Sequence, residues 1–299
     1  MHQPGKWWVG LIPLAIVWIA CAIATTKRFE ENAGAAALAA VVALGPDILD
    51  NPGVTVSGRD ATFTGQTFDT PDTTLRAAAE GATGVRLVHV ATVPTPTAKP
   101  YTIAFLRDGG DVVLSGNVPS PSERAELLAA ATKSAAPSPV IDKLVYATGA
   151  PLGFKLMAMS GIEQTAALTS GRMSLSDNGF SIPGLAATTL SYEAALSAAQ
   201  KFPAGFTLTK ADILPPLKQP YAWSAQKNAD GISLGGDAPT LESRAASATA
   251  AAALFAGAAV KNNLGIARGA PAGDFGAMTG LALGALTRLT SGTAILTDG

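Results

Sequence analysis

Residues 100–124 read PYTIAFLRDGGDVVLSGNVPSPSER, and this stretch decides the expected fold. Tyr101, Ile103 and Phe105 occupy alternate positions, which is typical of a strand with one buried face. Asp108-Gly109-Gly110 predicts a turn, and Val112–Ser115 reads as the partner strand. The stretch therefore predicts a β-hairpin that ends at Gly116.

A helix is expected directly after this hairpin. Ser120 can cap it, Pro121 suits the first helical position, and Glu123 can complete a capping box. The helix is expected to continue through an Ala- and Leu-rich stretch to about Ser134, before a third strand at Val140–Tyr146. The predicted unit is strand, strand, helix, strand.

The chain repeats itself at an offset of 120 residues. Pro100-Tyr101 returns as Pro220-Tyr221, and Gly149-Ala150-Pro151-x-Gly153 returns as Gly269-Ala270-Pro271-x-Gly273. A bias in composition would not readily place both motifs at one offset, so an internal repeat is expected.

The same order of patterns occurs four times. The predicted units cover residues 54–93, 100–148, 172–214 and 220–268, with linkers at Pro94-Thr95-Pro96 and Leu214-Pro215-Pro216. Two longer helices are expected at about 152–168 and 274–289. Their apolar residues predict packing on their own sheets, and a partner-binding or membrane-surface face is the alternative. The residues expected on these faces are Leu152, Leu156, Met159, Ile162 and Leu168, and Phe275, Met278, Leu286 and Leu289.

Residues 7–26 form a run of twenty without a charge, and they predict a contact with the lipid membrane. At about 1.5 Å per residue, such a helix spans roughly 30 Å, the thickness of a bilayer core. Trp7 and Trp8 at one end and Lys27 and Arg28 at the other suit the two interfaces.

Two alternatives to a retained anchor stay open. In a secretory signal peptide, Lys6 would be the n-region, Val9–Ala20 the h-region and Ala22-Ile23-Ala24 the cleavage site. Cys21 could carry a lipid, although Trp18 stands where a lipoprotein signal wants an aliphatic residue. Anchor and signal both place the chain after Arg28 across the membrane.

Composition excludes several classes of function. The 299 residues carry 21 basic and 22 acidic side chains, a net charge of −1, so no nucleic-acid partner is expected. The single cysteine excludes an internal disulfide framework and a cysteine-based zinc site. Phosphate-loop, dinucleotide-binding and zinc-protease motifs are absent from the sequence. We therefore expect no enzyme activity, no cofactor, no metal and no catalytic residue.

Few side chains remain as candidates for a site. His2 lies at the extreme N-terminus, and strand alternation places His89 on the surface, opposite Val88 and Val90. Glu30 and Glu31 are adjacent on a helix, where neighbours diverge by about 100°, so they read as solvated charges near the membrane. Arg124 and Arg244 recur at equivalent helix positions; each is expected to cover the seam between helix and sheet, with a ligand contact as the alternative.

The hairpin ending Val112-Val113-Leu114-Ser115-Gly116 resembles the BON domain of bacterial envelope proteins, in which a glycine closes the second strand. The matching glycines here are Gly65, Gly116, Gly184 and Gly236. Over residues 7–299 the chain resembles the N-terminal half of BON-containing OmpA-family proteins. Unit 4 departs from the pattern with Gly235 in place of Ser115, and unit 3 with Pro183.

The resemblance implies an α+β chain with an N-terminal transmembrane helix followed by tandem BON-like strand-strand-helix-strand units. It implies a non-catalytic structural or binding component of the bacterial cell envelope, with the repeats on the periplasmic or outer side, contacting phospholipid or partner proteins. No binding residue of the peptidoglycan-binding OmpA-like domain is carried over, because its paired Asp and Arg lack their usual context here. A secreted or periplasmic lipid- or ligand-binding protein, released by cleavage after Ala24, is the alternative.

The expected division of the chain has five parts. They are an anchor or signal at 1–28, units 1 and 2 at 29–148, a connecting helix at 149–171, units 3 and 4 at 172–268, and a second connecting helix with the start of a truncated fifth unit at 269–299. The segment from Thr293 to Gly299 parallels the first strand and turn of unit 3. Without a hairpin partner it is expected to be unpaired or poorly ordered, and prone to self-association.

Overall fold

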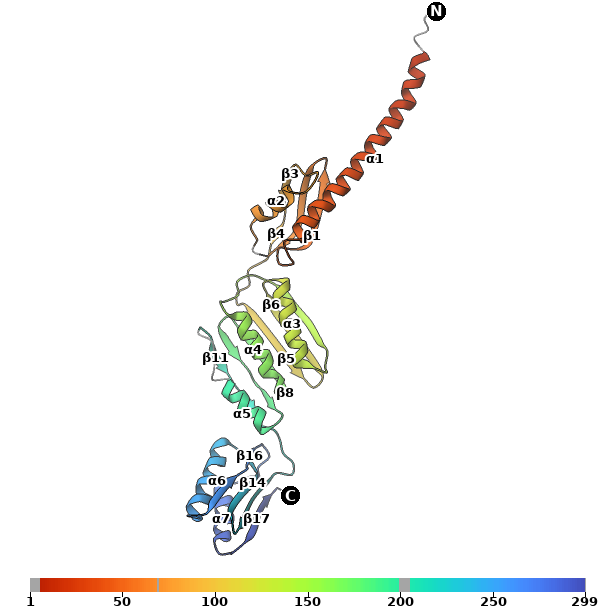
Figure 1. Cartoon of the computed structure of the whole chain (residues 1–299). Coiled ribbons are helices and arrows are strands. Elements are labelled where there is room, and N and C mark those ends of the chain that lie inside the picture. The colour runs from red at the N-terminus through yellow and green to blue at the C-terminus, as the bar shows by residue number, and fades with distance from the viewer. Residues whose placement is uncertain (1–5, 69, 199–204, 299) are drawn as a thin grey trace, which may run out of the picture. The chain divides into compact units, whose positions relative to one another are not determined.

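The computed structural model describes residues 6–68, 70–198 and 205–298. In this part of the chain, seven helices combine with three sheets that contain both parallel and antiparallel pairs (Figure 1). The protein is therefore α+β, as expected. It divides into two compact bodies: Met1–Tyr101 with Asn117–Glu126 and Leu144–Ala150, and Thr102–Gly116 with Leu127–Lys143 and Pro151–Gly299.

The first sheet follows the long N-terminal helix. Its elements are α1 (Lys6–Val42), β1 (Leu49–Ser57), β2 (Asp60–Thr67), α2 (Asp72–Glu80), β3 (Leu87–Val90) and β4 (Val93–Pro94). The strands β1 and β2 form an antiparallel hairpin around the expected turn at Gly58, and β3 and β4 both run parallel to β2.

The second sheet is the largest, with the order β11-β9-β8-β5-β6-β7 and with β10 joined to β8 and β12. Its elements are β5 (Thr102–Asp108), β6 (Asp111–Val118), α3 (Pro121–Ala135), β7 (Val140–Tyr146), α4 (Phe154–Ala166), β8 (Leu168–Ser176), β9 (Gly179–Ser181), β10 (Gly184–Ala186), α5 (Thr189–Ala198), β11 (Thr207–Lys210) and β12 (Ile213–Leu214). The helix α3 begins at Pro121, as the capping pattern predicts. The expected end of α5 near Gln200 lies outside the described residues.

The third sheet has the order β15-β14-β13-β17, with β16 also paired to β14. Its elements are β13 (Ala222–Asn228), β14 (Gly231–Ala238), α6 (Leu241–Leu254), β15 (Ala259–Asn262), β16 (Gly265–Ile266), α7 (Phe275–Thr287) and β17 (Gly292–Thr297). The side chain of Thr240 caps α6 by accepting a hydrogen bond from the backbone N–H of Ser243 at 3.0 Å.

Residues 120 apart occupy equivalent places in the second and third sheets. Ile103 pairs with Gly116 in one hairpin, and Trp223 pairs with Gly236 in the other. On the other side, Ile103 pairs with Leu175 of β8, and Trp223 pairs with Leu296 of β17. β5 is thus flanked by β6 and β8, and β13 by β14 and β17. In each case one neighbour is the next strand along the chain and the other follows a later helix.

The glycines that close the hairpins are needed because two backbones approach closely. Gly116 and Gly236 have φ angles of +122° and +86°. A Cβ at Gly116 would clash with the carbonyl oxygen of Thr102, and a Cβ at Gly236 with that of Ala222. Only glycine satisfies both the left-handed backbone and the close approach.

The two helices expected to connect units instead contribute to the cores of their sheets. Packing on their own sheet is the favoured prediction, and it is confirmed. The face expected for the first of them, α4, is right only in part, because Ile162 and Leu168 are buried but other members are not. Leu152 and Leu156 are exposed, while the residues buried on α4 are Phe154, Met157, Ala158, Gly161, Ile162 and Thr165. On α7, Phe275 and Leu286 are buried as expected, and Leu289 is exposed. The helix phase could not be read from the sequence because both faces of α4 are rich in apolar residues.

The expectation of an unpaired C-terminal segment is wrong. Gly292–Thr297 forms β17, which pairs antiparallel with β13 along its whole length. The side chain of Asp298 also accepts a hydrogen bond from the backbone N–H of Tyr221 at 2.7 Å. The repeat pattern indicates only a hairpin partner for this strand, whereas α7 carries the chain back to the side of β13 that β14 does not occupy. Gly299 lies outside the described residues.

Candidate membrane anchor and its junction with the first sheet

The N-terminal helix is apolar on every side before it reaches the first sheet. Residues 10–42 contain a stretch long and apolar enough to cross a membrane, with a mean hydropathy of 1.7 and no residue buried within it. The large exposed side chains of this part are Leu11, Ile12, Leu14, Ile16, Val17, Trp18, Ile19 and Ile23. A helix that is apolar all round requires an apolar environment, and none is supplied by the described residues. The side chains of Trp7 and Trp8 lie outside the described part.

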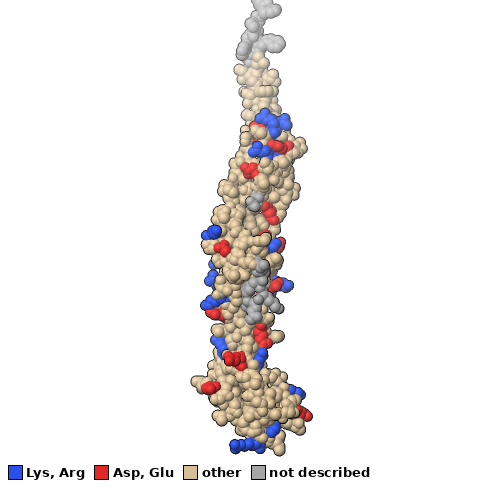
Figure 2. Space-filling model, turned by 90° about the vertical axis from the view of Figure 1, so that its left-hand side faces the viewer, with Lys and Arg blue, Asp and Glu red and all other residues tan. Residues whose placement is uncertain are grey.

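A short charged band follows the apolar run. Lys27, Arg28 and Glu31 are exposed and Glu30 is half-buried. Figure 2 shows an uncharged stretch of the helix that gives way to a cluster of blue and red side chains. Such charges suit the boundary between a bilayer and water.

Beyond this band the same helix becomes part of the first core. Ala33, Ala37 and Val41 recur every four residues and are at most 2% exposed. They face the sheet core formed with Phe63, Leu75, Val88 and their neighbours. Gly34 lets the helix approach β1, since a Cβ there would lie 3.3 Å from Val56. The helix is uninterrupted between the apolar run and the core.

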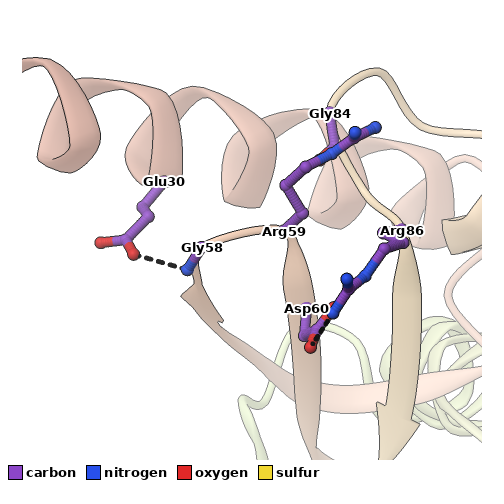
Figure 3. A network of polar contacts seen from close by, with 6 residues as sticks. All are labelled: Glu30, Gly58, Arg59, Asp60, Gly84 and Arg86. Atoms are coloured by element: carbon purple, nitrogen blue, oxygen red, sulfur yellow. Dashed lines mark hydrogen bonds and ion pairs between the residues drawn. The ribbon is translucent and has the colours of Figure 1, made fainter.

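Polar contacts hold the helix at the β1–β2 turn (Figure 3). A carboxylate oxygen of Glu30 accepts a hydrogen bond from the backbone N–H of Gly58 at 2.6 Å. Glu30 therefore has a structural contact in addition to its solvent exposure, which the sequence did not reveal. Nearby, Arg59 donates to the carbonyl oxygen of Gly84 at 3.3 Å.

The same figure shows an ion pair across two strands. Arg86 on the approach to β3 donates to both carboxylate oxygens of Asp60, at 2.9 and 3.0 Å. The hydrogen bonds from Arg86 hold the pKa of Asp60 below its ordinary value. Because Arg86 is largely exposed and Asp60 is partly exposed, water screens this pair and it contributes little to stability.

A cavity of about 550 Å³ lies beside the end of α1. Its wall is mainly apolar and includes Val41, Leu49, Pro52, Pro121 and Tyr146, with Asp50 and Asn51 as the polar members. The cavity is large enough for part of an acyl chain or a small apolar ligand.

Asp47 holds the start of α3 next to this cavity. Its carboxylate accepts hydrogen bonds from the backbone N–H of Ser122 at 2.8 Å and from the Ser122 hydroxyl. Burial raises the pKa of Asp47, but the hydrogen bonds from Ser122 and from the Ser120 side chain together outweigh it and hold the pKa below its ordinary value. No pattern near residue 47 could have indicated this, because its partner lies 75 residues away.

The residues singled out from the sequence do not come together in one site. His89 is exposed on β3, as strand alternation predicts. Arg124 stacks on the ring of Tyr146 at 5.3 Å, and Arg244 forms a 2.5 Å ion pair with Glu193. Both arginines thus contact protein groups, which favours the structural role. His2 lies outside the described residues.

Two basic residues that cap helix ends were missed. Arg107 donates to the carbonyl oxygens of Ser134, Ala166 and Leu168, and Lys227 donates to those of Leu286 and Leu289. They are 120 residues apart, so a comparison of charges at the repeat offset could have found them. Both cations meet the carbonyl end of α4 or α7, where positive charge is favourable.

Within the described ranges, no group of three or more His, Cys, Asp or Glu side chains is placed to hold a metal ion. The long apolar helix and its junction are therefore the strongest candidate for a functional feature. No family model, no curated protein and no solved structure matches this chain.

Proposed function

We propose that this chain is a non-catalytic, membrane-tethered structural or binding component of the bacterial cell envelope. The observation that carries the proposal is the continuity of α1, which is fully exposed and apolar around Ile16 and buried in a sheet core at Ala37. A single rigid helix would join the bilayer to the first sheet.

The modules after the anchor are proposed to be BON-like. The closing glycines support this, since Gly65, Gly116 and Gly236 all have φ between +86° and +141° next to a neighbouring strand. The strand-strand-helix-strand order also recurs after β1, β5 and β13. A further helix and strand complete the modules of the second and third sheets: α4 and β8 in the second sheet, and α7 and β17 in the third.

Contacts with phospholipid or with partner proteins are proposed for the uncovered sheet faces. In the second sheet, Leu106 of β5 and Ile141 of β7 are 39% and 45% exposed, while Phe105 and Leu144, on the other face of the same strands, are buried. Apolar side chains on an open sheet face provide a surface for a lipid or protein partner. The proposal places the modules on the periplasmic or outer side.

Membrane extraction tests the anchor. The full chain is expected to stay in the membrane fraction during an alkaline carbonate wash. The variant Ile16→Arg places a charge mid-span, at a cost of about 2.5–3.5 kcal/mol on insertion scales, and should shift protein to the soluble fraction. Leu190→Arg, at a position on α5 that is 76% exposed, is the matched control and should remain with the membrane. Release of the unchanged chain by carbonate would contradict the proposal.

The alternative function is a secreted or periplasmic lipid- or ligand-binding protein released by cleavage after Ala24. Two observations favour it: α1 contributes to the core only from Ala33 onward, and the 550 Å³ cavity is largely apolar. Sequencing of the mature N-terminus separates the two functions. A terminus at Thr25 supports release, and an intact segment before it supports tethering.

A further inference from the structure

A groove of about 360 Å³ runs between α1 and β1, just beyond the apolar run of the helix. Its polar side chains are Lys27, Glu30 and Glu31 from α1 and Thr55 from β1. The other residues that line it are small or aliphatic: Gly34, Ala35, Val54 and Val56. The whole groove lies within the first compact body, and its volume is in the usual range of small-ligand sites.

The position of the groove along α1 indicates what surrounds it. Lys27 is the first charged residue after the uncharged run 7–26, and Glu31 lies about 6 Å further along the helix axis. The headgroup layer on each side of a bilayer core is roughly 5–7 Å thick. With the run in the core, as proposed above, Lys27 and Glu31 lie at the depth of the lipid headgroups. The inference that follows rests on that proposed tether.

The charged groups of the groove have bonding capacity that the protein leaves unused. The Lys27 ammonium and the Glu31 carboxylate are exposed, and neither bonds to another of the described residues. Glu30 accepts from the backbone N–H of Gly58 at 2.6 Å with one oxygen, Oε1, while its Oε2 has no partner in the described part of the chain (Figure 3). One cation and two carboxylates are therefore available to a ligand.

The balance of charge favours a ligand that carries both signs. Lys27, Arg28, Glu30 and Glu31 sum to zero, so this part of the helix has no general attraction for an anionic headgroup. A headgroup with a phosphate alone would meet two carboxylates in the groove, and like charges repel. A headgroup with a phosphate and a cation matches the lysine and the carboxylates together.

The chemistry of the lining also indicates which cation fits. A primary ammonium donates three hydrogen bonds, and carboxylates are strong acceptors for them. A trimethylammonium group donates none, and proteins typically bind it with aromatic rings. None of the described residues that line the groove is aromatic. The groove therefore suits a primary ammonium better than a choline group.

We propose that this groove binds the headgroup of phosphatidylethanolamine in the leaflet next to the first sheet. The Lys27 ammonium donates to the lipid phosphate, and the ethanolamine ammonium donates to Glu31 and to Oε2 of Glu30. The acyl chains of the lipid lie along the apolar part of α1. Ile23, which is 64% exposed, precedes Lys27 by four residues and is therefore on the same flank of the helix.

Lipid binding by the full chain in detergent tests the proposal. Native mass spectrometry would count bound lipids during titration with phosphatidylethanolamine, phosphatidylcholine or phosphatidylglycerol that carry the same acyl chains. Phosphatidylethanolamine should bind at least about fivefold more tightly than phosphatidylcholine, because only its ammonium can donate hydrogen bonds to the carboxylates. Phosphatidylglycerol should bind no better than phosphatidylcholine. A preference for phosphatidylglycerol would overturn the proposal, because it would indicate a site for an anionic lipid.

Two variants separate the roles of the groove residues. Glu31→Gln should abolish the preference for phosphatidylethanolamine and leave the affinity for phosphatidylcholine unchanged. Lys27→Gln should weaken both lipids alike, because both carry the phosphate. Glu80→Gln, on the exposed surface of α2, is the matched control and should keep the preference. The thermal midpoint of Glu31→Gln should not fall, because this side chain is exposed and makes no bond to the described residues.

The result that overturns the inference differs from the one that overturns the tether. Equal binding of phosphatidylethanolamine and phosphatidylcholine, or a preference that survives Glu31→Gln, would reject the headgroup site. If the same chain resists the carbonate wash, the tether stands without the site. Release of the chain by carbonate would reject the tether, and with it the placement of the groove among headgroups.

Discussion

At the scale of single residues, neighbouring glycines of β14 face opposite steric demands. Gly236 has a φ of +86° and no room for a Cβ beside the carbonyl of Ala222. Gly235 has ordinary backbone angles, and a Cβ there would meet only the hydroxyl of Ser224 at 3.2 Å. The two glycines are adjacent in the sequence, but their tolerance of a side chain should differ greatly.

We predict that Gly236→Ala lowers the free energy of unfolding by about 2 kcal/mol or more, from backbone strain and the clash together. Gly235→Ala, the matched control, should change it by no more than about 0.5 kcal/mol. Urea denaturation followed by circular dichroism measures both. Equal effects of the two variants would show that the close approach of β13 and β14 is not as described.

Asp47 should make stability depend on pH. Its folded pKa lies below the ordinary value of 3.8, so its contribution is present above that pH and is lost as pH falls through the folded pKa. Asp47→Ala should lower stability by about 1 kcal/mol near pH 7, as the loss of a helix cap does. The difference from the unchanged chain should disappear towards pH 2.

Denaturation at pH 7, 4 and 2 tests this. Asp50→Ala is the control for a nearby carboxylate that does not bond to Ser122. A difference between Asp47→Ala and the unchanged chain that stays constant over this range would exclude the carboxylate as the stabilising group.

At the scale of elements, α1 combines two requirements in one helix. Its first half must be apolar all round, and its second half needs small residues where it meets the sheet. Ala33 and Gly34 are buried there, while Ala35 is exposed. The sequence shows the apolar run plainly, but it does not show which alanines are in contact.

Ala37→Leu should therefore destabilise the first sheet by about 1–3 kcal/mol, because three more carbon atoms must fit a fully packed position. Ala35→Leu, two positions earlier on the exposed side, should be close to neutral. Protease protection of the β1–β2 hairpin in membrane vesicles or detergent would report the difference. Equal protection of both variants would mean that α1 does not pack as described.

At the scale of the whole molecule, folding is expected to be independent of divalent metals. No cluster of metal-binding side chains occurs in the part of the chain that the structure describes. A bound structural metal contributes directly to the free energy of folding. Addition of chelator should leave the calorimetric midpoint within about 1 °C, and a fall of more than about 5 °C would reveal a metal site.

Local patterns in the sequence were sufficient for several features. The hairpins around Gly58 and Gly109, the start of α3 at Pro121 and the surface position of His89 all follow from neighbours a few residues apart. The apolar run in α1 and the 120-residue offset also need no tertiary information. These features depend on local backbone preferences and on the spacing of residues along the chain. Both can be read directly from the sequence.

Only the tertiary structure decided which strands share a sheet and which groups meet. β8 pairs with β5, and β17 pairs with β13, although helices separate the paired strands along the chain. Asp47 bonds to Ser122, which lies 75 residues later in the sequence. The buried face of α4 was also settled only by packing, because Leu152 and Leu156 are as apolar as the residues that lie inside. Strand pairing and side-chain burial depend on the surface against which each helix or strand packs in the folded chain. Residues distant in the sequence form that surface, so local patterns do not specify it.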